Sequence, residues 1–507
     1  MQLGFVIDHS RCIGCHACTV ACKSENDVPL GSFRTWVKYT ERGEFPQVKR
    51  SFAVLRCNQC TAAPCVTICP TSALEKRSDG IVDVNPDHCI GCKSCMQGCP
   101  YDALYIGMNG TAEKCHFCAH RTERGLAPAC AVVCPTEAII PGDFDDSQSV
   151  VSRMRRDLGL EARKVEAGTG PNVLYREADS AGLQPLETNA SGGYLWSNRV
   201  GGVELAAEEF RAAEDASSAR TTYDVEHNQW WGWRVSAYLL TKAISAGAVL
   251  AAVPTLLRPG IGDEGGAWAA GLALLFLLAT TALLIADLKR PERFFLILKR
   301  PNWNSWLVRG TVFLMGYGGL LTLWVALVLA RATPTGALRV LLVALMAVFA
   351  AGAAGYTGAL FAQCRGRVLW MQRGLWAALI VRAVMAGAGF LVLLRPAVEL
   401  IGQFDYLRWI AVVAALTHIG FSIFAGRLAP EKREKEHHEA HRLLVSGPFA
   451  KQHIAALVLP GLACLVLMNP PTPVGIWIHA LAGLLLLVAL WAHEDGFVKA
   501  GQALPIS

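Results

Sequence analysis

Sixteen of the eighteen cysteines lie between Cys12 and Cys134, in four groups with recurring spacing. Each group begins with two cysteines three residues apart and ends with two cysteines four residues apart. Closely spaced thiolates on a tight loop can bind one cube of iron and sulfide, and in two-cluster ferredoxins the last cysteine of a run binds the neighbouring cluster. Four ligands per cluster therefore predict four 4Fe–4S clusters. The groups are Cys12, Cys15, Cys18 and Cys22; Cys57, Cys60, Cys65 and Cys69; Cys89, Cys92, Cys95 and Cys99; and Cys115, Cys118, Cys130 and Cys134.

Disulfides and zinc are the alternatives for so many cysteines. A disulfide framework needs export, and residues 1–30 contain no apolar segment typical of a signal peptide. Zinc ribbons use isolated CxxC pairs and not the run CxxCxxCxxxC. The remaining two cysteines, Cys364 and Cys464, lie in apolar sequence without metal-ligand spacing, so we expect them to be structural thiols.

Composition divides the 507 residues into a polar half and an apolar half. Residues 1–229 are charged and cysteine-rich, and apolar runs dominate from about residue 230 onward. The net charge of +6 is modest, and no lysine-rich face with interleaved aromatic residues predicts nucleic-acid binding.

The first half predicts an α+β, duplicated ferredoxin-like domain over residues 1–145. Short strand patterns alternate with the cysteine loops, and residues 34–56 alternate polar and apolar side chains around a Gly turn, as a β-hairpin does. Residues 146–229 combine charged helical patterns with Gly- and Asn-rich loops and contain no run long enough to cross a bilayer. We expect them to cover the cluster domain and to link it to the second half.

The second half, residues 230–507, predicts an all-α transmembrane bundle of eight helices. Its apolar stretches approach or exceed the ~20 residues that span a bilayer, and they are rich in Gly and Ala, as closely packed membrane helices are. The stretches are 234–257, 266–287, 307–330, 337–361, 374–394, 406–428, 452–469 and 475–493.

Charge in the connecting loops predicts the orientation. The loops on the side of the cluster domain contain 16 Lys and Arg residues, and the opposite loops contain 5. The positive-inside rule therefore predicts a multi-pass protein of the bacterial inner (cytoplasmic) membrane, with the iron–sulfur domain on the cytoplasmic face.

The cysteine motifs resemble a known family. The patterns RCNQC with PC and CP, GIV followed by CIGC and CPY, and KC-FC with PAC and CP are similar to the four-cluster iron–sulfur subunit of the dimethyl sulfoxide reductase family of molybdenum enzymes. The resemblance covers about residues 3–145. It implies that motif one pairs with motif four and motif two with motif three. The implied ligand sets are Cys12, Cys15, Cys18 and Cys134; Cys22, Cys115, Cys118 and Cys130; Cys57, Cys60, Cys65 and Cys99; and Cys69, Cys89, Cys92 and Cys95.

A second resemblance concerns the membrane half. The opening WGW with YL, and the loop motif DLKRPERF followed by RPN, are similar to the NrfD or polysulfide-reductase type of membrane anchor. Such anchors accompany the four-cluster protein and exchange electrons with quinone. The two resemblances together imply an electron-transfer and anchor subunit of a molybdopterin oxidoreductase, with ubiquinone or menaquinone as mobile cofactor and membrane lipid around the bundle. Anchors of this type usually lack haem, so none is expected.

Candidate quinone-binding residues are the polar side chains near the cluster-bearing ends of the helices. An ionisable residue at the centre of a membrane helix costs ~2.5–3.5 kcal/mol on insertion scales, so each is a functional candidate. We select Tyr238, Lys242, Asp287 and Arg382. His418, His453, His479 and His493 are interpreted as bundle histidines, and the histidines of the run 431–442 as part of a charged surface helix.

No substrate-transforming site is predicted in this chain, so the catalytic residues of the complex are expected on a molybdopterin-containing partner subunit. Sulfur-oxyanion chemistry, such as cytoplasmic sulfite oxidation, is the favoured partner reaction. Two alternatives remain: the same relay serving a hydrogenase or a multihaem cytochrome, and a proton-translocating energy-converting module.

Overall fold

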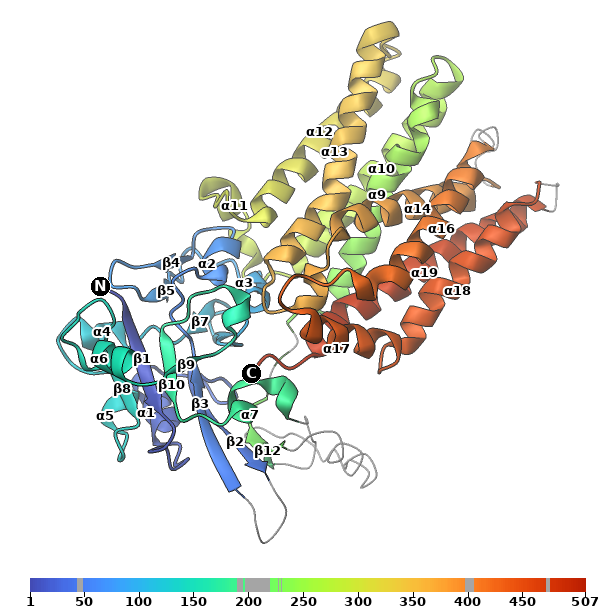
Figure 1. Cartoon of the computed structure of the whole chain (residues 1–507). Helices are drawn as coiled ribbons and strands as arrows, with labels where there is room; N and C mark the ends of the chain where they lie inside the picture. The colour runs from blue at the N-terminus through green and yellow to red at the C-terminus, as the bar shows by residue number, and fades with distance from the viewer. Residues whose placement is uncertain are drawn as a thin grey trace.

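The computed structural model describes residues 1–42, 49–188, 195–196, 219–226, 228, 230–396, 405–470 and 475–507. Figure 1 shows an α+β domain, which contains the first strands, at one end of a long helical bundle. The C-terminal end of the chain lies on the same side as this domain. The predicted fold class is confirmed, because the ferredoxin-like half carries the β-sheets and the second half is helical.

Two four-stranded sheets frame the cluster domain. The first has the order β8-β1-β10-β9, with β1 paired antiparallel to β8 and parallel to β10. The second has the order β11-β12-β2-β3, and the antiparallel pair β2–β3 is the hairpin predicted between the first two motifs. The strands are β1 (Leu3–Asp8), β8 (Ile139–Asp143), β9 (Glu161–Ala162), β10 (Val173–Arg176), β2 (Thr35–Arg42), β3 (Lys49–Arg56), β11 (Leu195–Trp196) and β12 (Ala219–Asp224).

The segment predicted as a cover contributes strands to both sheets. Strands β9 and β10 extend the sheet of β1, and β12 pairs with β2 along most of its length. Helices α6 (Val150–Asp157) and α7 (Ser180–Leu183) lie on the same domain. The described parts of this segment, among them residues 146–188 and 219–226, therefore belong structurally to the cluster domain.

A repeated unit positions the cysteines. A two-stranded hairpin leads from the second motif into the third, and another leads from the third motif into the fourth. A short helix begins within or just after each cysteine loop and precedes or carries the last cysteine of the first three motifs, while α5 precedes that of the fourth. The hairpin strands are β4 (Leu74–Lys76), β5 (Val82–Val84), β6 (Leu104–Ile106) and β7 (Ala112–Lys114), and the helices are α1 (Ala17–Glu25), α2 (Pro64–Ile68), α3 (Ser94–Gly98), α4 (Ala119–Thr122) and α5 (Ala129–Val132).

Eight helices of the described residues are long and apolar enough to cross a membrane, as predicted. The last one continues about ten residues beyond the predicted end, so its final turns lie against the cluster domain. The helices are α9 (Trp233–Leu256), α10 (Ile261–Ala286), α12 (Trp306–Leu329), α13 (Gly336–Gln363), α14 (Leu375–Leu394), α16 (Tyr406–Phe424), α18 (Ala450–Leu467) and α19 (Gly475–Ala503). Two shorter helices, α11 (Leu296–Lys299) and α17 (Glu434–Val445), lie at the end of the bundle that faces the cluster domain.

Small residues allow the central helices to approach closely. A Cβ atom on Gly247 of α9 would lie 1.6 Å from the carbonyl oxygen of Ala383 in α14, and one on Gly387 would lie 1.9 Å from the carbonyl carbon of Gly247. No side chain fits between these backbones, which explains the Gly and Ala content of the bundle.

Polar contacts fix the cluster domain on the bundle. Gln97 donates to Gln502 of α19 at 2.8 Å and accepts from Arg367 at 2.7 Å. On the other side, Asn302 donates to the carbonyl oxygen of Cys69 at 2.8 Å. The ring of Trp370 stacks on those of Trp231 and Phe361, and the three residues share a buried core with cysteines of the second and third motifs. The junction is therefore a buried interface and not a flexible tether.

Candidate functional site

One of the implied cysteine sets lines a cavity. Cys22, Cys115, Cys118 and Cys130 surround a space inside the cluster domain, together with Phe5 and Arg56 among other side chains. The four thiols come from α1, α5 and the loop before α4, so sequence positions more than 100 residues apart meet at one point. This arrangement fits a compact inorganic cluster bound by one thiolate at each corner.

The other three sets are also brought together. Cys12 is within electrostatic range of Cys15, Cys18 and Cys134. The thiols of the second motif interact with that of Cys99, and those of the third motif with that of Cys69. The structure thus brings motif one beside motif four and motif two beside motif three, and the four ligand sets stay a prediction.

The surroundings of the thiols suit an anionic cluster. Arg56 is fully buried, donates from Nη1 to Sγ of Cys130 at 3.2 Å, and has two nitrogens without a partner among the described residues. Burial alone would lower the pKa of Arg56, but the thiolates of Cys130 and Cys115 raise it. Backbone N–H groups of Ala112 and Ala138 donate to Sγ of Cys89 and Cys134, both at 3.3 Å. Hydrogen bonds of this kind tune the reduction potential of a bound cluster.

A single metal ion fits this arrangement less well. Within the described part of the chain, no three His, Cys, Asp or Glu side chains converge closely enough to hold one ion. In a 4Fe–4S cluster each thiolate binds a different iron atom, so the thiols surround a larger space than the ligands of one zinc ion do.

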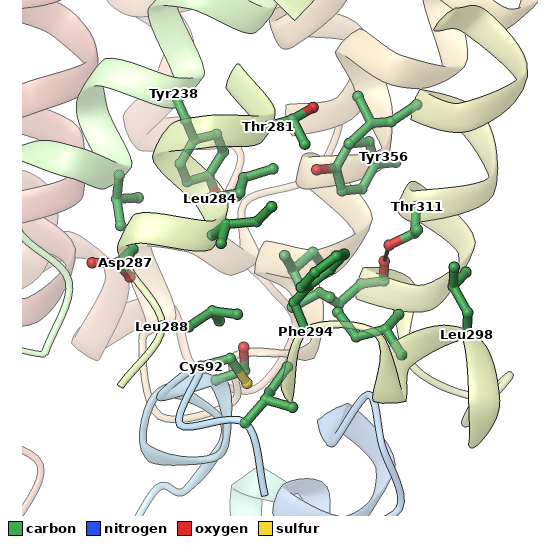
Figure 2. Close-up of a pocket in the computed structure, with 18 of the residues that line it drawn as sticks. Cys92, Tyr238, Thr281, Leu284, Asp287, Leu288, Phe294, Leu298, Thr311 and Tyr356 are labelled. Carbon is green, nitrogen blue, oxygen red and sulfur yellow. Dashed lines mark hydrogen bonds between the residues drawn. The ribbon is translucent and has the colours of Figure 1, made fainter. Parts of the chain in front are cut away.

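A pocket of about 270 Å³ lies where the cluster domain meets the bundle. Its walls come from α9, α10, α12 and α13, from the loop around Phe294, and from the third cysteine motif. Figure 2 shows Cys92 on the loop at one end of the pocket, below Leu288 and Phe294, and Tyr238, Thr281 and Tyr356 on the helices beyond. The lining is mostly apolar, with a few hydroxyl groups and one carboxylate, which is typical of sites for small organic ligands.

Two of the four candidate residues line this pocket. They are Tyr238, which is 6% exposed, and Asp287 at the end of α10. Asp287 accepts from Nζ of Lys93 at 2.7 Å, and Lys93 directly follows Cys92 in the third motif. This ion pair links α10 to the cysteine loop, so Asp287 has a positioning contact that its sequence context did not predict.

Lys242 lies behind the pocket wall rather than in it. Its Nζ is 4.6 Å from the ring centre of Tyr356 and 5.9 Å from that of Tyr238, and it donates to the hydroxyl of Thr357. The whole Lys242 residue is 2% exposed. Lys242 is therefore one layer behind the two tyrosines that line the pocket, and it does not reach the cluster-side surface of the bundle.

Arg382 does not line the pocket either. Its Nη1 pairs with Oε1 of Glu494 in α19 at 3.4 Å, and both side chains are about 3% exposed. Glu494 is also within electrostatic range of Lys242. The four candidates thus divide into two at the pocket and two in a buried polar cluster behind it, which also contains Thr357 and Glu494.

The loop after α10 contacts the cluster domain. The backbone N–H groups of Lys289 and Arg290 donate to the carbonyl oxygens of Gly91 and Ile90, and Arg293 donates to that of Pro86 at 2.7 Å. These contacts hold the third cysteine motif against the membrane half.

Several residues that line the pocket were not predicted from the sequence. Tyr356, Thr281 and Thr311 lie in apolar helices whose sequence gives no sign of which face turns toward the pocket. Their hydroxyl groups are ordinary in membrane helices, and only the packing of α10, α12 and α13 selects them. Lys93 lies within a cysteine motif, where its spacing suggests no contact with the membrane half.

Comparison with known proteins identifies both halves. The model of the family described as polysulphide reductase, NrfD, matches residues 221–502, more than half of the sequence. This protein belongs to that family. A 4Fe–4S dicluster domain model matches residues 48–144 in front of this NrfD-type anchor.

Individual relatives match the iron–sulfur half. A tetrathionate reductase subunit of Salmonella typhimurium is 44% identical over 191 residues, which is 36% of this chain and 76% of the relative. A polysulfide reductase chain of Wolinella succinogenes is 38% identical over 187 residues, 36% of this chain and 98% of the relative. A Halobacterium salinarum protein named as a dimethyl sulfoxide reductase iron–sulfur subunit is 36% identical over 216 residues, 36% of this chain and 82% of the relative. The chain therefore joins a 4Fe–4S electron-transfer subunit to an NrfD-type multi-pass membrane anchor.

Proposed function

We propose that this chain transfers electrons between a molybdopterin-containing catalytic subunit and the quinone pool. Four 4Fe–4S clusters, when bound by the sixteen motif cysteines, would each supply a one-electron redox centre. The observation that supports the proposal is the pocket beside Cys92, because this cavity of the membrane half directly adjoins the loop of the third cysteine motif.

The pocket suits a quinone head group. Its volume of about 270 Å³ is slightly below the ~300–1,000 Å³ typical of small-molecule sites, and its apolar lining favours a lipid-soluble ring. Quinone carbonyls need hydrogen-bond donors, and the hydroxyls of Tyr238 and Tyr356 are the best placed. Lys242 behind Tyr356 would supply positive charge and a proton donor. We assign Asp287 to positioning the cysteine loop through Lys93, and Arg382 to holding Glu494.

The opposite end of the relay faces solvent. Cys15 of the first motif is exposed. Apolar side chains surround this motif on α1 and α5, which pack together, and Ile13, Val20 and Val132 are 58%, 65% and 64% exposed. Exposed apolar residues gathered at one place are typical of a protein interface. We propose that the catalytic subunit docks here, so that electrons travel from this surface to the pocket beside Cys92.

The names of the relatives indicate the class of the catalytic substrate but not the compound itself. Three of them are named for reactions of tetrathionate, polysulfide and dimethyl sulfoxide, which supports a sulfur compound as the substrate of the partner subunit. None of these three names supports sulfite oxidation, so we favour reduction of a sulfur compound with electrons from quinol. Placement in the bacterial cytoplasmic membrane, with the clusters on the cytoplasmic face, rests on the loop charges.

Filling the pocket tests the quinone assignment. Leu284→Trp, on the pocket-lining face of α10, is expected to lower kcat/KM for decylubiquinone at least about tenfold, a loss of ~1.4 kcal/mol of binding. The matched control is Leu278→Trp on the same helix, where the leucine is 61% exposed.

The assay uses the purified complex, with reduced methyl viologen as electron donor and decylubiquinone as acceptor. Cluster reduction by the viologen should be equal in the two variants. Equal quinone turnover in Leu284→Trp and Leu278→Trp would exclude this pocket as the quinone site.

A further inference from the structure

Four histidines on four different helices follow one another through the cluster-side half of the bundle. His493 of α19 lies 5.0 Å, centre to centre, from the ring of His418 in α16. His453 of α18 is within electrostatic range of both. The ring of His453 is in turn 6.5 Å from that of His441 in α17. The four side chains connect the interior of the bundle to the helix that lies across its end.

Each of these rings has a nitrogen without a hydrogen-bond partner among the described residues. Three of the four histidines are almost fully buried, at 4%, 1% and 7% exposure for His493, His418 and His453. An unsatisfied buried polar group costs about 1–3 kcal/mol, and water commonly satisfies such groups. The rings of His493 and His418 are in T-shaped contact, so a water molecule would bridge their unpartnered nitrogens around the ring edges. The unpartnered atoms are Nε2 of His493, Nδ1 of His418, Nδ1 of His453 and Nε2 of His441.

The inner end of this row reaches the pocket wall. His493 precedes Glu494, whose Oε2 has no hydrogen-bond partner in the described part of the chain. Glu494 is within electrostatic range of Lys242, and Lys242 lies against the ring of Tyr356, which lines the pocket. Arg382 pairs with Glu494 and is within electrostatic range of His493 and His418, so ionisable groups continue from the pocket to the histidines through Lys242, Glu494 and Arg382.

The outer end of the row reaches solvent. His441 is half-buried, and the neighbouring His438 on α17 is exposed. Burial lowers the pKa of His441, and the nearby His453 and His438 lower it further. Both effects favour the neutral imidazole, which has one N–H group and one free nitrogen and can accept a proton at one nitrogen and release one from the other. Helix α17 packs against α18 and α19 at the cluster-side end of the bundle (Figure 1).

We infer that His493, His418, His453 and His441 line a hydrated proton path between the pocket and the cluster-side surface of the membrane. This inference rests on the proposed quinone chemistry. Reduction of a quinone adds two electrons, which arrive through the cysteine-bound clusters, and two protons, one to each carbonyl oxygen. Oxidation of quinol reverses both flows. The path supplies or removes these protons, with Lys242 and Glu494 as its inner members.

The position of the path fixes the side of proton exchange. Electrons and protons meet the quinone from the same face, so the quinone reaction moves no net charge across the bilayer. This outcome differs from that of a proton-translocating module, which needs ionisable groups through both halves of the membrane.

Replacement of single histidines in the purified complex tests the path. His418→Phe keeps a ring of similar size and removes both nitrogens. We expect it to lower decylubiquinone turnover with reduced methyl viologen at least about tenfold, because positioned proton transfer contributes ~10²–10⁴ in rate. The KM for decylubiquinone and the reduction of the clusters should not change. His453→Ala should behave likewise, and added imidazole should restore its turnover.

The matched control is His479→Phe. His479 lies on the same helix as His493, is 2% exposed and also has an unpartnered Nδ1 among the described residues, but it is near the opposite end of α19. Its replacement should leave turnover unchanged. An equal loss in His479→Phe, or failure of imidazole to restore His453→Ala, would assign the losses to packing and overturn the path. Absence of quinone turnover in the wild-type complex would instead overturn the proposed function.

Proteoliposomes test the side of exchange. A membrane-impermeant reduced viologen donates electrons only to complexes whose cluster domains face outward. We expect two protons per decylubiquinone to disappear from the outer medium, with no change in a pH dye trapped in the lumen. Alkalinisation of the lumen would overturn the inference.

Discussion

Replacing Cys92 by serine is expected to abolish electron transfer to quinone while three of the four clusters remain. Cys92 belongs to the cysteine set nearest the pocket, and its side chain is part of the pocket lining. Serine offers a hydroxyl in place of the thiolate that iron–sulfur clusters require. Electron paramagnetic resonance of the anaerobically reduced complex should show one altered cluster, and decylubiquinone turnover should fall to background.

The control for this variant is Cys464→Ser. Cys464 is also buried, but it lies in α18 with its thiol directed at the carbonyl oxygen of Val412, away from the cysteine motifs. The iron content of the Cys464→Ser variant should match that of the wild-type protein, which is about sixteen iron atoms for four clusters. Normal quinone turnover in Cys92→Ser would show that the cluster beside the pocket does not transfer electrons to the quinone.

Removing the charge of Arg382 is expected to be the most destabilising change in the membrane half. Arg382 and Glu494 are both buried, and loss of one partner leaves the other charge uncompensated, at a cost of about 3–5 kcal/mol. Arg382→Leu should therefore lower the melting temperature of the purified complex in detergent. The double variant Arg382→Leu/Glu494→Leu should recover most of the loss, because apolar pairs replace buried ion pairs at little cost.

An exposed ion pair gives the comparison. Arg373 and Glu431 are 4.0 Å apart at the cluster-side end of the bundle, and their side chains are 62% and 82% exposed. Arg373→Leu should change stability by no more than about 1 kcal/mol. A double variant as unstable as Arg382→Leu would contradict the pairing and assign Arg382 another role.

The cluster domain and the helix count could be predicted because their signals are local. Thiol spacing within each motif and apolar runs of about 20 residues need no knowledge of tertiary structure. The grouping of Cys22 with Cys115 and Cys118 around one cavity is not local, and only the family resemblance suggested it. Strand β12 was missed as part of the cluster domain for a related reason, since its partner β2 lies about 180 residues earlier in the chain.

The candidate site was predicted only in part. Depth along the helices directed attention to the cluster-side end, where the pocket lies, but depth does not tell which face of a helix turns toward a pocket. Tyr238 and Lys242 are one turn apart on α9, yet Tyr238 lines the pocket and Lys242 lies behind Tyr356. The histidines were interpreted singly, and the row that His418 and His453 form depends on the packing of α16 against α18.

The most direct measurement of the central proposal is the reoxidation of pre-reduced clusters by quinone. The purified complex is reduced anaerobically, freed of reductant, and mixed with decylubiquinone in the absence of any substrate of the catalytic subunit, so that electrons leave only through the anchor. We predict that the visible absorbance of the clusters returns to its oxidised level in the wild-type complex and in Leu278→Trp, and returns much more slowly in Leu284→Trp. Clusters that stay reduced in the wild-type complex under excess decylubiquinone would contradict the account.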